Sequence, residues 1–127
     1  MPEGQNDKKI LIVEDDMFLS ELVSVRFQKE GLHFSVKTDG ETALEEARNV
    51  HPNLIILDIL LPGIDGYEVL KRLKEDKELS NIPVLIISNL GRKDEIDKAR
   101  DLGAVGFLVK ARADLDDIVA KVRGLLK

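Results

Sequence analysis

Short apolar runs alternate with longer amphipathic stretches along this chain. Four short runs rich in Ile, Leu and Val are typical of buried strands, at residues 10–13, 54–57, 84–87 and 107–109. Residues 33–38 alternate apolar and polar side chains instead, which is typical of a half-exposed strand at the edge of a sheet. The pattern therefore predicts five strands, with the second strand in the chain at an edge.

The stretches between the strands carry apolar residues at helical spacing. The first repeats this pattern with Phe18, Leu22 and Val25, and the clearest amphipathic helix runs from Leu115 to Leu126. The other expected helices contain residues 43–47, 69–73 and 94–102. An alternation of strands and helices predicts right-handed crossovers and a doubly wound α/β fold, with a parallel sheet covered by helices on both faces.

Capping residues and glycines support these helix boundaries. Asp65 precedes Glu68 by three residues, as in a capping box, and Thr38 stands in the same relation to Glu41. Gly31 follows one helical pattern and Gly103 another, at positions where a left-handed residue ends a helix.

Composition narrows the function classes. The 127 residues suffice for one domain, and the absence of Cys excludes disulfides and thiolate chemistry. A net charge of -5 and few aromatic side chains argue against nucleic-acid binding. The apolar segment 54–61 is too short to span a membrane and no signal peptide is visible, so we expect a cytoplasmic protein. We expect residues 1–7 to be a disordered tail and the chain to end with its single domain.

Polar side chains follow the predicted strands at their carboxyl ends, where ligands bind in open parallel sheets. Glu14, Asp15 and Asp16 follow the first strand, and Asp58 follows the third. Taken alone, the first group is explained as caps for the next helix. Asp58 favours a functional site over a structural role, because an unpaired charge after a buried strand is costly. Carboxylates from two strand ends form a cluster of hard oxygen ligands, which favours Mg²⁺.

Two further strands end in side chains suited to phosphate. Ser88 ends the fourth strand and Lys110 the fifth, although a turn cap and a solvent-reaching lysine are the ordinary interpretations. Together with the acids, they form a set that would stabilise an anion being attached to a carboxylate. Phosphoryl transfer to Asp58 has this requirement.

Four motifs in order resemble the receiver domain of response regulators in two-component signalling, of the flavodoxin-like CheY type. They are KILIVEDD at 9–16, LIILDILLPGIDGYEVL at 54–70, PVLIIS at 83–88 and GAVGFLVK at 103–110. The resemblance covers residues 8–127 and implies a receiver domain there, with five helices around strands in the order 2-1-3-4-5.

The resemblance also implies how the acids act. Asp58 would be the phosphoacceptor that takes a phosphoryl group from a phosphohistidine of a sensor kinase or phosphotransfer protein. Asp15 would bind Mg²⁺ directly and Glu14 through a water molecule. An oxygen of Asp58 and the backbone carbonyl of Leu60 would complete the protein ligands.

Three more residues match the response of this family to phosphorylation. Lys110 would pair with the phosphoryl group, Ser88 would donate a hydrogen bond to it, and Phe107 would be the aromatic residue that turns inward. The output would pass to a separate protein through the face formed by the fourth helix, fifth strand and fifth helix. Plain core packing is the simpler interpretation of Phe107.

Two positions depart from the family pattern. Ala111 stands where proline usually follows the lysine, often after a cis bond. Because a cis bond before a non-proline residue costs about 2.5–4 kcal/mol, we expect a trans bond with a reshaped loop or a strained cis bond. Asn89 replaces a small residue, and we expect it to affect access to Asp58 or the lifetime of its phosphate.

Three other functions remain open. The complete set of acids argues against a receiver that binds proteins without being phosphorylated, although Asn89 and Ala111 keep this alternative open. A phosphatase of the haloacid-dehalogenase type would need a second Asp two residues after the nucleophile, where Leu60 stands. A flavodoxin-like cofactor binder would need a Ser/Thr/Gly-rich loop after the first strand. His33 and His51 show no metal-binding spacing.

Overall fold

Five parallel strands form one sheet at the centre of the computed structural model, which describes residues 7–127. The strands are β1 (Lys9–Val13), β2 (His33–Lys37), β3 (Leu54–Leu57), β4 (Val84–Ser88) and β5 (Gly106–Val109). Their order is β2-β1-β3-β4-β5, which confirms both the predicted order and the edge position of β2. Every residue of the central strand β3 is buried, as a strand covered on both faces requires.

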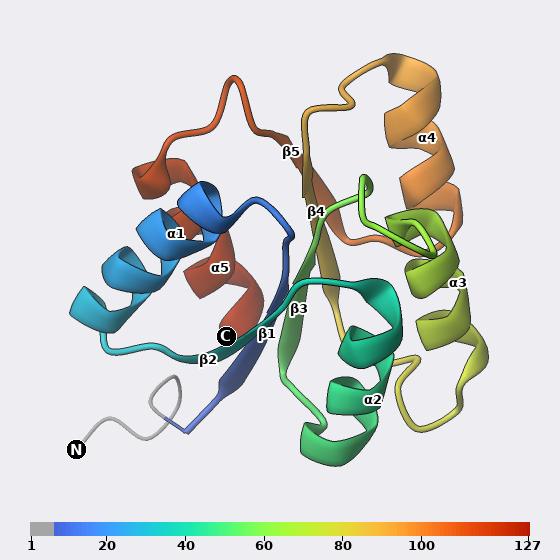
Figure 1. Cartoon of the computed structure of the whole chain (residues 1–127), viewed down its shortest axis with the longest axis horizontal. Helices are drawn as coiled ribbons and strands as arrows, with labels where there is room; N and C mark the ends of the chain where they lie inside the picture. The colour runs from blue at the N-terminus through green and yellow to red at the C-terminus, as the bar shows by residue number, and fades with distance from the viewer. Residues whose placement is uncertain (1–6) are drawn as a thin grey trace.

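Two helical layers cover the sheet. The helices are α1 (Met17–Lys29), α2 (Gly40–Val50), α3 (Gly66–Glu75), α4 (Lys93–Asp101) and α5 (Leu115–Leu126). α1 and α5 lie on one face, and α2, α3 and α4 lie on the other (Figure 1). Each layer encloses its own apolar cluster against the sheet. The predicted doubly wound α/β fold is therefore confirmed.

The helix starts depend on aspartates that follow strands. Asp16 accepts a hydrogen bond from the Leu19 N–H at 3.1 Å and begins α1, and Asp65 does the same for the Glu68 N–H at 2.9 Å. The predicted capping pair of Thr38 and Glu41 is wrong, because Asp39 caps α2. β2 ends at Lys37, so the chain reaches the helix one residue later than the pattern suggested.

α1 forms where predicted but faces the other way. The sequence suggested Phe18, Leu22 and Val25 as its apolar stripe, whereas Phe18 is 74% exposed and the other two are 42% and 47% exposed. Val23 and Phe27 are buried instead. Both sides of this helix are apolar, so the periodicity that located it could not identify its buried face.

Backbone conformations confirm the expected turns. Gly31 has φ 75° and Gly103 has φ 107°, the left-handed values predicted for residues that end helices. No peptide bond within residues 7–127 is cis, so the bond from Lys110 to Ala111 is trans, the first of the two expected arrangements. None of the helices in that range is long and apolar enough to cross a membrane. Six residues of the tail predicted at 1–7 lie outside the described range.

Candidate functional site

Hydrogen bonds that continue the sheet past its strand ends bring the predicted polar residues together. The Asp58 N–H donates to the Val13 carbonyl at 3.1 Å, which fixes the first residue after β3 beside the end of β1. The Lys110 N–H donates to the Ser88 carbonyl at 2.9 Å and joins the ends of β5 and β4 in the same way. Parallel register therefore places side chains from four strands at one edge of the sheet.

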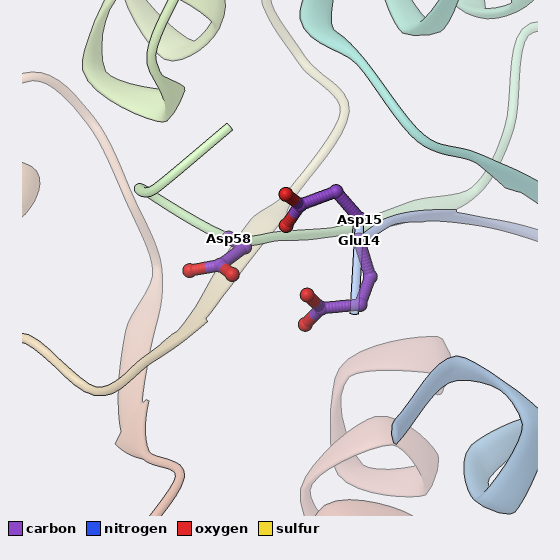
Figure 2. A group of neighbouring side chains, drawn as sticks. All are labelled: Glu14, Asp15 and Asp58. Atoms are coloured by element: carbon purple, nitrogen blue, oxygen red, sulfur yellow. The ribbon is translucent and has the colours of Figure 1, made fainter. Parts of the chain in front are cut away.

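Three carboxylates meet at this edge. Glu14 and Asp15 follow β1, and both turn their carboxylates toward Asp58 (Figure 2). One oxygen atom from each of the three residues lies within 4.8 Å of the others. Glu14 and Asp58 are only 5% and 4% exposed, whereas Asp15 is exposed to solvent. The cluster thus consists of two buried acids and a third acid that is exposed to solvent.

Lys110 bridges the two buried acids. Its Nζ lies 2.7 Å from Oδ2 of Asp58 and 2.7 Å from Oε1 of Glu14. Burial lowers the pKa of Lys110, but the two hydrogen bonds outweigh that effect and the pKa is raised. Burial raises the pKa of Glu14, as does the charge of Asp58, against the opposing hydrogen bonds from Lys110 and the Asp16 N–H. The ammonium group therefore stays charged.

The donor set fits a hard divalent cation. Three carboxylates and one ammonium group leave two formal negative charges at the site, which a divalent cation would neutralise. The ligand atoms are oxygens from side chains of mixed burial, and the exposed Asp15 leaves space for water. Mg²⁺ is bound in this way, through one or two carboxylates with several waters retained.

The remaining carboxylate oxygen of Asp58 is also held. The Leu60 N–H donates to Oδ1 of Asp58 at 3.3 Å, while Lys110 binds Oδ2. The side chain of Leu60 is 55% exposed and points away from the core, so this residue acts here through its backbone. A carboxylate held on both oxygens has a defined orientation before any reaction begins.

Ser88 and Phe107 lie nearby in different environments. Ser88 is fully buried, and its Oγ accepts a weak hydrogen bond from the Leu90 N–H at 3.4 Å. Phe107 is half-buried and packs against the apolar cluster under α2, α3 and α4. It also borders a cavity of about 130 Å³ between α4 and β5. The expected roles of both residues in responding to a phosphoryl group stay predictions.

Gly66 is a site residue that the sequence did not single out. Its N–H donates to the Ile59 carbonyl at 2.8 Å, and a Cβ atom at this position would lie 2.2 Å from the backbone oxygen of Asp58. Only glycine permits this approach of α3 to the residue after β3. The sequence shows the signal as Asp65-Gly66 after the acid, but it equally fits an ordinary helix start.

The two positions that depart from the family pattern are both exposed. Asn89 follows the buried Ser88, and Ala111 follows Lys110. After Lys110 the chain turns tightly, with the N–H groups of Arg112 and Ala113 donating to the Val109 carbonyl at 2.9 and 3.0 Å.

Comparison with known proteins gives consistent matches. The sequence model of the response regulator receiver domain matches residues 10–123. Sporulation initiation phosphotransferase F of Bacillus subtilis is 37% identical over 120 residues, which cover 94% of both chains. The DNA-binding transcriptional regulator RpaA of Synechocystis is 36% identical over 119 residues, which cover 94% of this chain and 49% of that protein. The chain thus spans about half the length of RpaA and of several other curated relatives.

The solved structures agree with the sequence matches. The receiver domain of the Francisella response regulator 1452 superimposes with a TM-score of 0.87 at 26% identity. The alignment covers 94% of this chain and 97% of that one. Similarity therefore extends over both the sequence and the arrangement of the strands that carry the acids.

Proposed function

The chain belongs to the response regulator receiver domains, and on that premise we propose that Asp58 accepts a phosphoryl group from a histidine kinase or phosphotransfer protein. The observation that carries the proposal is the bridge from Lys110 to Asp58, beside Glu14 and Asp15. A buried carboxylate with an adjacent ammonium group and two further acids is suited to attack phosphorus while the added charge is compensated.

The transfer step is a simple substitution at phosphorus. A carboxylate oxygen of Asp58 forms the new O–P bond as the N–P bond of the phosphohistidine breaks. The imidazole nitrogen of the donor leaves with the bonding electron pair. Lys110 then holds the phosphoryl oxygens, because its Nζ already lies 2.7 Å from the attacking carboxylate. The product is an acyl phosphate, which water can later hydrolyse.

Mg²⁺ is the cofactor that we propose for this step. Asp15 and Asp58 would bind it directly, Glu14 through a water molecule, and the Leu60 carbonyl would complete the protein ligands. When bound, the ion supplies charge compensation for the phosphoryl oxygens. Glu14 is already engaged by Lys110 at 2.7 Å, which supports an indirect role for this acid.

Incubation with acetyl phosphate and Mg²⁺, followed by intact-protein mass spectrometry, tests the proposal. We expect the wild-type chain to gain the mass of one phosphoryl group, and we expect EDTA to prevent the gain. No gain with Mg²⁺ present would contradict phosphorylation and favour a receiver that binds proteins without it. Continued turnover of phosphate esters would instead favour the phosphatase alternative.

The exposed apolar face of α1 supports a protein as the phosphoryl donor. Phe18, Leu22 and Val25 line a groove of about 550 Å³ that continues to Leu115 at the start of α5. α1 also reaches the acid cluster, because Leu19, the neighbour of Phe18 in its first turn, borders a small cavity that Asp58 lines as well. We therefore place the docking site of the phosphohistidine protein on this face.

Replacing Phe18 with serine separates docking from chemistry. We expect transfer from the histidine kinase that phosphorylates the wild-type chain to slow by about tenfold or more, since large aromatic side chains dominate interfaces. Labelling by acetyl phosphate, measured in parallel, should not change. Val105→Ser, which also removes an exposed apolar side chain, serves as the control. Equal losses with both donors would contradict this docking site.

The output of the phosphorylated chain is proposed to pass to a separate protein. We assign the contact to the face of α4, β5 and α5, with Ser88 and Phe107 responding to the phosphoryl group. The chain covers 94% of sporulation initiation phosphotransferase F and 49% of RpaA, so its relatives include both short and longer proteins. A cytoplasmic location is part of the same proposal.

A further inference from the structure

α4 is the helix with the weakest anchor in the core. Among the described residues it buries only Ala99 completely, whereas α1 buries three residues and α2, α3 and α5 bury four each. The cavity of about 130 Å³ beside Phe107 further reduces its packing against β5. Helices with few buried apolar contacts open locally at low free energy. Individual polar contacts therefore contribute more to holding α4 against the sheet than they do for the other helices.

Tyr67 makes two such contacts with α4. This residue lies in the first turn of α3, and its hydroxyl donates a hydrogen bond to the Glu95 carbonyl at 3.1 Å. The ammonium group of Lys98 lies 4.2 Å from the centre of its ring, within the range of a cation–π interaction. Glu95 and Lys98 are three residues apart and lie on the same face of α4. One side chain thus contacts α4 through both its hydroxyl and its ring.

Tyr67 is also connected to the acid cluster through the backbone. Its neighbour Gly66 donates to the Ile59 carbonyl and sits so close to Asp58 that no Cβ atom would fit. A shift of the backbone around Asp58 must therefore move the start of α3. Because Tyr67 is the next residue, the same shift changes its distance to Glu95.

We propose that Tyr67 is a positioning residue that latches α4 and connects its position to Asp58. The hydroxyl bond to Glu95 holds α4 in the arrangement seen here, and a change at Asp58 weakens that bond through Gly66. The latch itself depends only on the structure, whereas its connection to phosphorylation rests on the function proposed above. Phenylalanine at this position keeps the ring over Lys98 and removes the hydrogen bond alone.

Amide hydrogen exchange of the full chain tests the latch. In Tyr67→Phe we expect the amides of Lys93–Asp101 to exchange roughly 2- to 12-fold faster, which corresponds to one net hydrogen bond. Exchange in β1 and β3 should stay as in the wild type. Lys98→Gln, which keeps the hydroxyl bond, should increase exchange in α4 less than Tyr67→Phe does. Unchanged α4 exchange, or an equal increase in α4 and the central strands, would overturn the latch.

The rate of labelling by acetyl phosphate tests the connection to Asp58. If the arrangement held by Tyr67 is the less reactive one, releasing it increases the reactive population, and Tyr67→Phe should be labelled several-fold faster. Faster α4 exchange without faster labelling would overturn the connection. Failure of the wild type to be labelled at all would instead contradict the proposed function. Amide hydrogen exchange alone would then test whether Tyr67 holds α4 in place.

Discussion

Replacing Lys110 with methionine is expected to slow labelling of Asp58 by acetyl phosphate about 10²- to 10³-fold. The substitution removes the single cationic side chain seen within 2.7 Å of both buried acids in residues 7–127. Loss of one group that compensates charge in a transition state typically has an effect of this size. The measurement is the initial rate of mass gain at saturating Mg²⁺.

The same substitution should destabilise the fold. Breaking a buried ion pair by removing one partner costs about 3–5 kcal/mol, and we expect the lower end because burial already raises the pKa of Glu14, which can take up a proton. Urea unfolding measures the loss, and Mg²⁺ should restore part of it. Lys77→Met changes an exposed lysine and is the control. A Lys110 variant with wild-type rate and stability would contradict the charge balance described for this site.

Gly66→Ala is expected to lower the free energy of unfolding by about 1–3 kcal/mol, as overpacking of a filled site does. The new Cβ would lie 2.2 Å from the backbone oxygen of Asp58 and 2.7 Å from the Cα atom of Ile59. These are backbone atoms that cannot rotate away, so α3 or the nucleophile must move. A displacement of about 1 Å can cost roughly 10²-fold in rate, which labelling by acetyl phosphate would measure.

Gly124→Ala is the matched control for this prediction. Gly124 also lies within a helix, α5, but a Cβ atom there meets nothing within 4 Å. Alanine should therefore stabilise α5 by about 0.5–1 kcal/mol through its higher helix propensity. Equal effects of the two substitutions would show that helix propensity determines both stability changes, and would contradict the close approach at Gly66.

The strand ends could be predicted because two simple regularities locate them. Apolar runs identify the buried strands, and parallel strands present their carboxyl ends at one edge. Asp58 was informative since it follows an entirely apolar segment, and the structure places it beside Glu14 and Lys110. The cost of a cis bond without proline left two arrangements before Ala111, and the structure has the trans bond.

Other features depend on contacts between separate segments, which the spacing of apolar residues does not reveal. α1 has apolar residues on both sides, and only its contacts with the rest of the fold show that Phe27 is buried and Phe18 is not. Thr38 and Asp39 are both good N-caps, and the residue at which β2 ends determines which of them caps α2. The bond from Tyr67 to Glu95 joins two helices that are distant in the sequence, and no local pattern indicates it.

Chemical trapping locates the phosphoryl group that we propose Asp58 carries. Borohydride reduces an aspartyl phosphate to homoserine, so the labelled chain is reduced, digested and sequenced by tandem mass spectrometry. We expect homoserine at position 58 and at no other acid, and no conversion in Asp58→Asn. Homoserine at position 15, the corresponding five-carbon amino alcohol at Glu14, or labelling that persists in the Asp58 variant would contradict it.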